Sequence, residues 1–150
     1  MTSIPSGSTT LPELLGTQTH AHLKALFAQD AQASRLSERF ARIAEIEGFP
    51  EIARTLREVA ESQAFQAQGH LDLLFRAADP ISGRQVGETP QNLRAAIAAH
   101  DGELTDTLED MARGARAEGF PDVASWLDTM VYARKAHLQR LRDLLPEDGE

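Results

Sequence analysis

Three pairs of polar residues, each three positions apart, carry the side chains that could do chemistry in this sequence. The pairs are Gln63/Gln66, His100/Glu103 and Arg134/His137. Residues three apart lie on one face of a helix, and helix bundles present carboxylate and imidazole ligands to a pair of metal ions with this spacing. Asp30 adds one more carboxylate on the helical face of Leu23, Leu26 and Phe27. The spacing therefore suits a metal centre, although Gln63, Gln66 and Arg134 are not typical metal ligands.

These polar residues interrupt apolar seams that we expect to face a core. The seam of residues 121–145 is broken at Arg134 and His137, and that of residues 50–78 is broken at Gln63 and Gln66. Buried polar groups without partners cost a few kcal/mol each. We therefore expect them to satisfy one another, or a ligand, in one network.

Glycine and proline positions predict four helices that must hold these residues in place. The expected helices cover residues 17–47, 50–78, 89–118 and 121–145, after a flexible segment 1–16 and before an acidic tail 146–150. The Glu-Gly-Phe-Pro turn at 47–50 recurs 71 residues later at 118–121, which indicates two repeated helical hairpins. The connection 79–89 is long enough, at ~3.3 Å per residue, to run the length of a bundle. The fold class is therefore predicted as an all-α four-helix bundle with a long crossover.

Composition narrows the classes of function. The chain of 150 residues carries a formal net charge of −8 and has no cysteine. A negative chain does not attract nucleic acid or anionic membrane surfaces. The lack of thiols excludes disulfides, thiolate zinc sites and iron–sulfur clusters. No leader or membrane-spanning run is recognised, so we expect a cytoplasmic protein.

Six sequence segments carry a family resemblance that spans roughly residues 17–145. They are 27–33 (FAQDAQA), the two Glu-Gly-Phe-Pro turns, 60–63 (AESQ), 92–97 (NLRAAI) and 133–137 (ARKAH). In these segments the chain resembles the rubrerythrin family of ferritin-like di-iron proteins. The resemblance implies a ferritin-like four-helix bundle, and it implies a homodimer because family members commonly associate through bundle faces.

The resemblance also implies which positions would hold two irons. The family pattern has a glutamate in helix one, Glu-x-x-His in helices two and four, and two glutamates three apart in helix three. The matching positions in this chain are Asp30, Gln63, Gln66, His100, Glu103, Arg134 and His137, so the family's residue type is kept at Glu103 and His137. The two bridging glutamates become Gln63 and Arg134, and Ser37 and Leu108 stand where a redox tyrosine would be sought. Because the 150 residues contain no cysteine, we expect no counterpart of the family's cysteine-ligated iron domain among them.

Charge counting favours a metal-free interpretation. Two carboxylates, Asp30 and Glu103, are set against the guanidinium of Arg134, which stays positively charged because it does not lose its proton. Our first hypothesis is that Arg134 replaces the irons and pairs with both carboxylates, with Gln63 and Gln66 completing the network. The protein would then be non-catalytic, without a cofactor, and would act as an interaction, assembly or protective module with a possible protein partner.

The alternative keeps a single Fe or Zn ion. His100, Glu103 and His137 supply two imidazoles and a carboxylate, with Asp30 or water completing the set. Such a site would make the protein an oxidoreductase, for peroxide reduction or iron handling.

Other singled-out residues have simpler interpretations. His70 is either a displaced ligand or, as we expect, a histidine at the edge of the core bonded to a neighbour. His20 and His22 are expected to face solvent. Trp126 and Tyr132 are expected at a bundle edge, with a subunit contact as the alternative.

Overall fold

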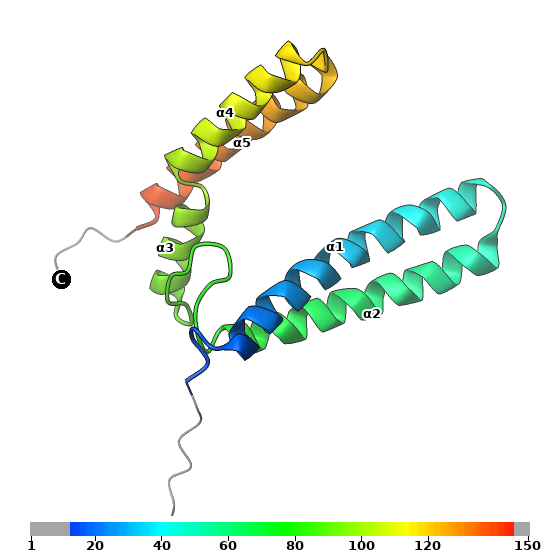
Figure 1. Ribbon diagram of the computed structural model, residues 1–150, viewed down its shortest axis with the longest axis horizontal. Helices are drawn as coiled ribbons and strands as arrows, with labels where there is room; N and C mark the ends of the chain where they lie inside the picture. Colours follow the sequence, from blue (N-terminus) through cyan, green and yellow to red (C-terminus); the bar gives the residue numbers. More distant parts are fainter. Residues whose placement is uncertain (1–12, 146–150) are drawn as a thin grey trace, which may run out of the picture. The chain divides into compact units, whose positions relative to one another are not determined.

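The computed structural model describes residues 13–145, without the side chains of residues 102–104. The predicted tail 146–150 and most of the predicted segment 1–16 lie outside the described residues. The chain divides into two compact units, Met1–Ala77 and Ala78–Glu150, and each is a separate body of helices (Figure 1).

The first unit is an antiparallel hairpin of two long helices, α1 (Gln18–Ile46) and α2 (Pro50–Leu74) (Figure 1). Thr17 caps α1 because its hydroxyl oxygen accepts a hydrogen bond from the backbone N–H of His20 at 3.1 Å. Gly48 ends α1 with a φ of 85°, a conformation that glycine adopts without steric cost. Proline then starts α2, where its missing N–H costs nothing.

The second unit contains α3 (Thr89–Ala99), α4 (Gly102–Ala117) and α5 (Pro121–Asp143). Helices α4 and α5 form the second antiparallel hairpin, and α3 packs against α5. The turn at Gly119 repeats that at Gly48, since Gly119 has a φ of 89° and Phe120 N–H donates to Ala115 O at 2.8 Å, as Phe49 does to Ala44 O. The predicted repeat of two hairpins is confirmed.

The prediction of one helix over residues 89–118 is wrong. His100 ends α3 with φ −106° and ψ 8°, and a new helix begins at Gly102. The sequence Asp101-Gly102 explains the break, because glycine costs about 1 kcal/mol in a helix interior and aspartate favours helix caps. His100 and Glu103 consequently lie on two different helices, and not one turn apart on a single helix.

Helix α2 is also shorter than the predicted segment 50–78. After Leu74 the backbone tightens into i→i+3 hydrogen bonds, with Arg76 N–H donating to Leu73 O at 3.2 Å. Pro80 follows, and a proline disfavours helical backbone at the preceding residue. The helix therefore ends four residues early.

The connection between the units folds back on itself at its start. Asp79 N–H donates to Arg84 O at 2.8 Å, and the Asp79 carboxylate accepts from Ile81 N–H at 2.9 Å and from the Ser82 N–H and hydroxyl. Burial acts to raise the pKa of Asp79, but the hydrogen bonds from Ser82 and Ile81 lower it below its ordinary value. Residues 79–84 are therefore a closed loop, whereas the length argument assumed an extended crossover.

Alanines are among the most buried residues where the helices of each hairpin meet, and in the second hairpin Leu108, Val131 and Leu138 are buried as well. Ala41, Ala53 and Ala124 are at most 1% exposed, whereas Ile52 and Val123 of the predicted seams are about half exposed. Alanine lets two helix backbones approach closely, so the larger side chains project beside the contact. None of the described helices is long and apolar enough to cross a membrane.

Candidate functional site

Two hydrogen bonds join polar side chains across α1 and α2. The His70 Nε2 atom lies 2.8 Å from Asp30 Oδ2, and both side chains are about one-fifth exposed. The Ser37 hydroxyl donates to Gln63 Oε1 at 2.8 Å, and Ser37 is 8% exposed. The expected hydrogen-bonded role of His70 is confirmed.

These two bonds are two helical turns apart on both helices. Asp30 precedes Ser37 by seven residues, and Gln63 precedes His70 by seven. Because the helices are antiparallel, a single register satisfies both bonds, and a shift by one residue would break both. Polar layers of this kind fix the register of paired helices. Sequence analysis missed Ser37 as the partner of Gln63; its signal was the seven-residue spacing from Asp30.

Gln66 does not join this network in the first unit. Its side chain is exposed on α2, whereas Ala67 beside it is buried. His70, one turn beyond Gln66, contacts Asp30 of α1 instead.

The second unit brings together two of the predicted ligands, His100 and His137. Their ring centroids are 6.3 Å apart and the rings meet edge to face at 79°. His100 Nδ1 lies 2.8 Å from the carbonyl oxygen of Ala96. Since a carbonyl accepts but does not donate, we assign the proton to Nδ1, and the neutral ring then has its lone pair on Nε2.

Arg134 lies on α5 one turn before His137 and is half-buried. Of its two predicted partners, Asp30 belongs to the other unit and the Glu103 side chain lies outside the described residues. The ion pairs of Arg134 with Asp30 and Glu103 stay a prediction. Among the side chains that the structure describes, which do not include that of Glu103, no group of three His, Asp or Glu could hold a metal ion.

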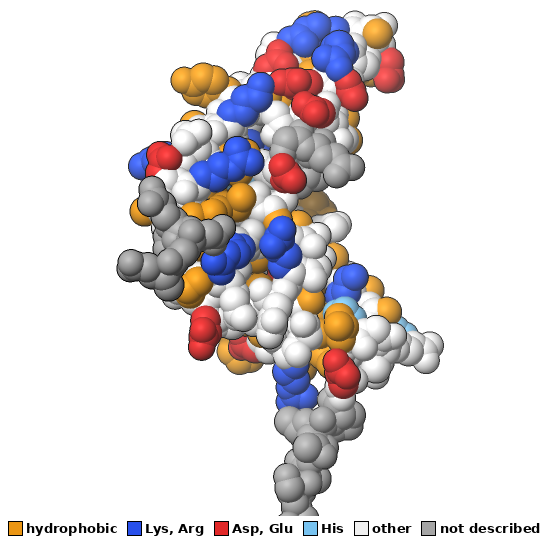
Figure 2. Space-filling view, turned by 90° about the vertical axis from the view of Figure 1, so that its left-hand side faces the viewer, with side chains coloured by type: hydrophobic (Ala, Val, Ile, Leu, Met, Phe, Trp, Pro, Cys, Tyr) orange, Lys and Arg blue, Asp and Glu red, His pale blue; other side chains and the backbone are white. Residues whose placement is uncertain are grey.

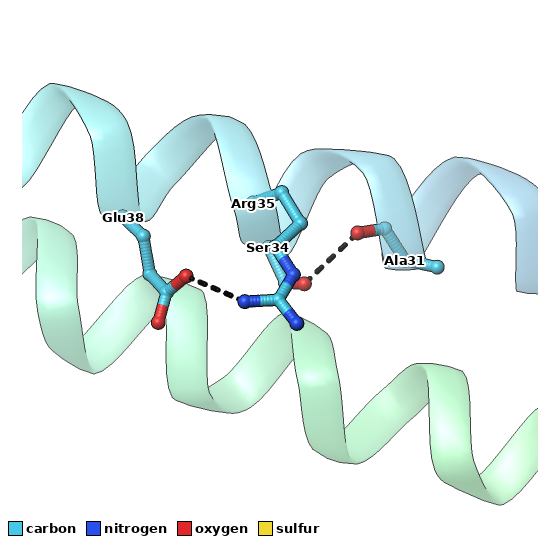
Figure 3. Close-up of polar contacts among 4 residues, drawn as sticks. All are labelled: Ala31, Ser34, Arg35 and Glu38. Carbon is cyan, nitrogen blue, oxygen red and sulfur yellow. Dashed lines mark hydrogen bonds and ion pairs between the residues drawn. The ribbon is translucent and has the colours of Figure 1, made fainter. Parts of the chain in front are cut away.

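A groove lies along the charged side of α1 and α2. Its volume is about 550 Å³, and three arginines and three glutamates line it together with small residues: Arg35, Arg42, Arg57, Glu38, Glu45, Glu61, Ser34, Ala60 and Ala64. Figure 3 shows that Arg35 pairs with Glu38, at 3.2 Å, while the Ser34 hydroxyl donates to Ala31 O within α1. Arg57 forms an ion pair with Glu45. The three arginines and three glutamates make the groove electrically balanced.

The remaining singled-out side chains divide between exposed and half-buried. His22 is exposed as expected, but His20 is half-buried, so its predicted exposure is wrong. Gly16 N–H donates to His20 Nδ1 at 3.2 Å, and Nε2 is buried without a hydrogen-bond partner among the described residues. Trp126 and Tyr132 are 66% and 80% exposed.

The all-helical fold, with antiparallel hairpins and polar residues set between their helices, defines a protein of the ferritin-like helical-bundle class. The rubrerythrin family model matches residues 22–145. The chain is 32% identical over 140 residues to a rubrerythrin of Porphyromonas gingivalis, covering 89% of this chain and 70% of that protein. It is 29% identical to rubrerythrin-1 of Clostridium acetobutylicum, covering 90% and 73%, and 27% identical to a rubrerythrin of Nitratidesulfovibrio vulgaris, covering 89% and 72%. The chain belongs to the rubrerythrin family.

Proposed function

We propose that this chain is a rubrerythrin-family protein whose di-iron positions have lost their ligands, and that it works as an interaction, assembly or protective module without metal. The observation that carries this proposal is the hydrogen bond from Ser37 to Gln63 Oε1, at 2.8 Å. The family resemblance places a bridging glutamate at position 63, where this chain has a neutral amide whose oxygen is already used within the hairpin.

Asp30 and Arg134 support the same proposal. The shorter Asp30 carboxylate stands where the family has a glutamate, and it is hydrogen-bonded to His70 within the first hairpin. Arg134 stands at the other bridging position, where its fixed positive charge would repel a metal pair. Two irons need several carboxylates to offset their charge. The residues at these positions, Asp30, Gln63 and Arg134, do not fit a di-iron centre. In the proposed protein Arg134 supplies the positive charge and pairs with Asp30 and Glu103.

Metal analysis after anaerobic loading with Fe(II) tests this proposal. Wild type is expected to hold less than a tenth of an equivalent of iron and to leave peroxide unconsumed. The double variant Gln63→Glu/Arg134→Glu restores both bridging carboxylates and is expected to gain iron. The control Arg140→Glu makes the same charge change as Arg134→Glu, but at an exposed position of α5, and should gain none. Stoichiometric iron with peroxide consumption in wild type would overturn the proposal.

A residual single-metal site is the second candidate, because His100 and His137 lie together with His100 Nε2 available as a ligand. One Fe or Zn ion at His100, Glu103 and His137, with Asp30 or water, would support peroxide reduction or iron handling. A tetrahedral ion with bonds of ~2.0–2.1 Å would bring the two ring centroids to roughly 5 Å. The observed 6.3 Å means that the rings would have to close by about 1 Å.

Zinc titration followed by calorimetry separates the two candidates. The single-metal candidate requires binding near one equivalent that His137→Ala abolishes and the control His22→Ala leaves unchanged. Absence of binding by wild type would remove this candidate and support the metal-free one.

We also propose that the chain forms a homodimer, as the family resemblance implies. The exposed aromatic side chains of Trp126 and Tyr132 support an association surface on α5, because aromatic residues are enriched in interfaces. Light scattering coupled to size-exclusion chromatography should give twice the chain mass of 16.4 kDa. A mass of one chain at micromolar concentration would contradict the dimer.

A further inference from the structure

A second cavity lies within the second unit, between α3 and the end of α5. Its volume is about 270 Å³. Arg84 from the connecting loop, Arg94 from α3 and Arg142 from the last turn of α5 line it together with Asp101, and Ile97 and Leu145 give it apolar walls. In Figure 2, Lys and Arg side chains gather at the middle of the visible face with hydrophobic side chains beside them.

The charge of this cavity is opposite to that of the whole chain. Three guanidiniums and one carboxylate give a formal charge of +2, in a chain with a net charge of −8. The guanidinium groups of Arg84, Arg94 and Arg142 form no ion pair with any described residue. The groove of the first unit differs, because its arginines are matched in number by glutamates and two of them are paired. The arginines of the second cavity are therefore available to a ligand.

We propose that this cavity binds a small dianionic oxyanion of the phosphate class. A guanidinium presents a planar fork of N–H donors that matches phosphate oxygens. A phosphate group carries about −1.5 to −2 charges at neutral pH, which matches the +2 of the cavity. The volume lies just below the ~300–1,000 Å³ typical of sites for drug-sized ligands, so the size suits a phosphate group on a small apolar body beside Ile97 and Leu145.

The three arginines are exposed, and this sets the expected strength of binding. Solvent and salt screen exposed charges, so the affinity should be moderate and should fall as ionic strength rises. The chain itself supplies a second source of the same anionic chemistry, because Glu147, Asp148 and Glu150 follow Leu145 in the sequence. The experiment must separate a free phosphate from these carboxylates.

Titration of the full chain with inorganic phosphate at constant ionic strength, followed by NMR of the arginine Nε–H groups and backbone amides, tests the proposal. Saturable shifts are expected at Arg84, Arg94 and Arg142. Arg94→Gln and Arg142→Gln should each weaken binding by about tenfold, the effect of losing a charge-assisted hydrogen bond. The control Arg42→Gln removes the same charge from the groove of the first unit and should leave the affinity unchanged. Acetate, with a single charge, should bind at least tenfold more weakly than phosphate.

A tail-neutralised chain, Glu147→Gln/Asp148→Asn/Glu150→Gln, identifies the source of the anion. Tighter phosphate binding by this variant would support the site and show that the tail carboxylates compete for it. Unchanged binding would support the site with free phosphate as its ligand. Arg84→Gln, in the connecting loop, provides a second variant if a helix substitution disturbs the fold. Absence of saturable shifts in both wild type and tail-neutralised chain, or equal weakening by Arg42→Gln, would overturn the proposal.

Discussion

Removal of the Ser37 hydroxyl offers a direct test of the polar layers between α1 and α2. Ser37 is 8% exposed and its hydroxyl is the donor to Gln63 Oε1 at 2.8 Å. Ser37→Ala leaves a largely buried amide oxygen without its donor, which costs about 1–3 kcal/mol. Because Gln63 is half-buried and water can partly replace the donor, we expect a loss of about 1–2 kcal/mol in the free energy of unfolding.

The double variant and a matched control separate this bond from other effects. Ser37→Ala/Gln63→Leu replaces both partners with apolar groups and should recover much of the loss. Ser34→Ala removes a hydroxyl that donates to Ala31 O of its own helix, at 2.9 Å, and should change stability by less than about 0.5 kcal/mol. Urea unfolding at 25 °C, followed by circular dichroism, measures all three variants. Equal losses in Ser37→Ala and Ser34→Ala would refute the inter-helix bond as a stabilising contact.

Three further predictions concern the loops and the ion pairs. The pKa of Asp79 is lowered in the folded chain. Its hydrogen bonds therefore stabilise the fold above the unfolded pKa, and this contribution is lost as the pH falls through the folded pKa. The difference in urea midpoint between wild type and Asp79→Asn should shrink as the pH falls from about 5 to 3. Gly48 and Gly119 have φ values of 85° and 89°, with open space around each. Substitution of either glycine by alanine should lower the free energy of unfolding by about 1–2 kcal/mol from backbone strain alone. Stability equal to wild type in thermal unfolding would contradict the turn geometry. Arg57→Glu places two like charges together at the exposed pair with Glu45 and should lower the free energy of unfolding by under about 1 kcal/mol. The added change Glu45→Arg should restore the unfolding midpoint. A double variant as unstable as the single one would count against the pair.

The repeated hairpins differ in their electrostatics in a way that the repeat itself does not predict. Glu45 and Arg57 pair across the first hairpin, and the positions 71 residues later pair with reversed polarity, as Arg116 and Asp128. Ser37 and Gln63 are likewise replaced by Leu108 and Arg134. The two hairpins therefore have the same backbone fold and turn, but their side-chain contacts differ.

The sequence by itself determined the helical content, the two turns and the repeat, because these depend on local chemistry. Glycine at a positive φ and proline in the first turn of a helix act within a few residues, so the turns that they form can be predicted from the sequence. The break at Asp101-Gly102 was equally local and was nevertheless missed, since the apolar periodicity on either side of it suggested one continuous helix.

Tertiary structure alone decided which polar side chains meet. Asp30 bonds to His70, which is 40 residues away, and Ser37 bonds to Gln63, although each of these residues had several conceivable partners along the chain. The choice depends on the register of two antiparallel helices, in which both polar bonds form together beside closely packed alanines such as Ala41 and Ala53. The arginine cavity has the same origin, because the packing of α3 against α5 brings together charges that lie up to 58 positions apart in the chain.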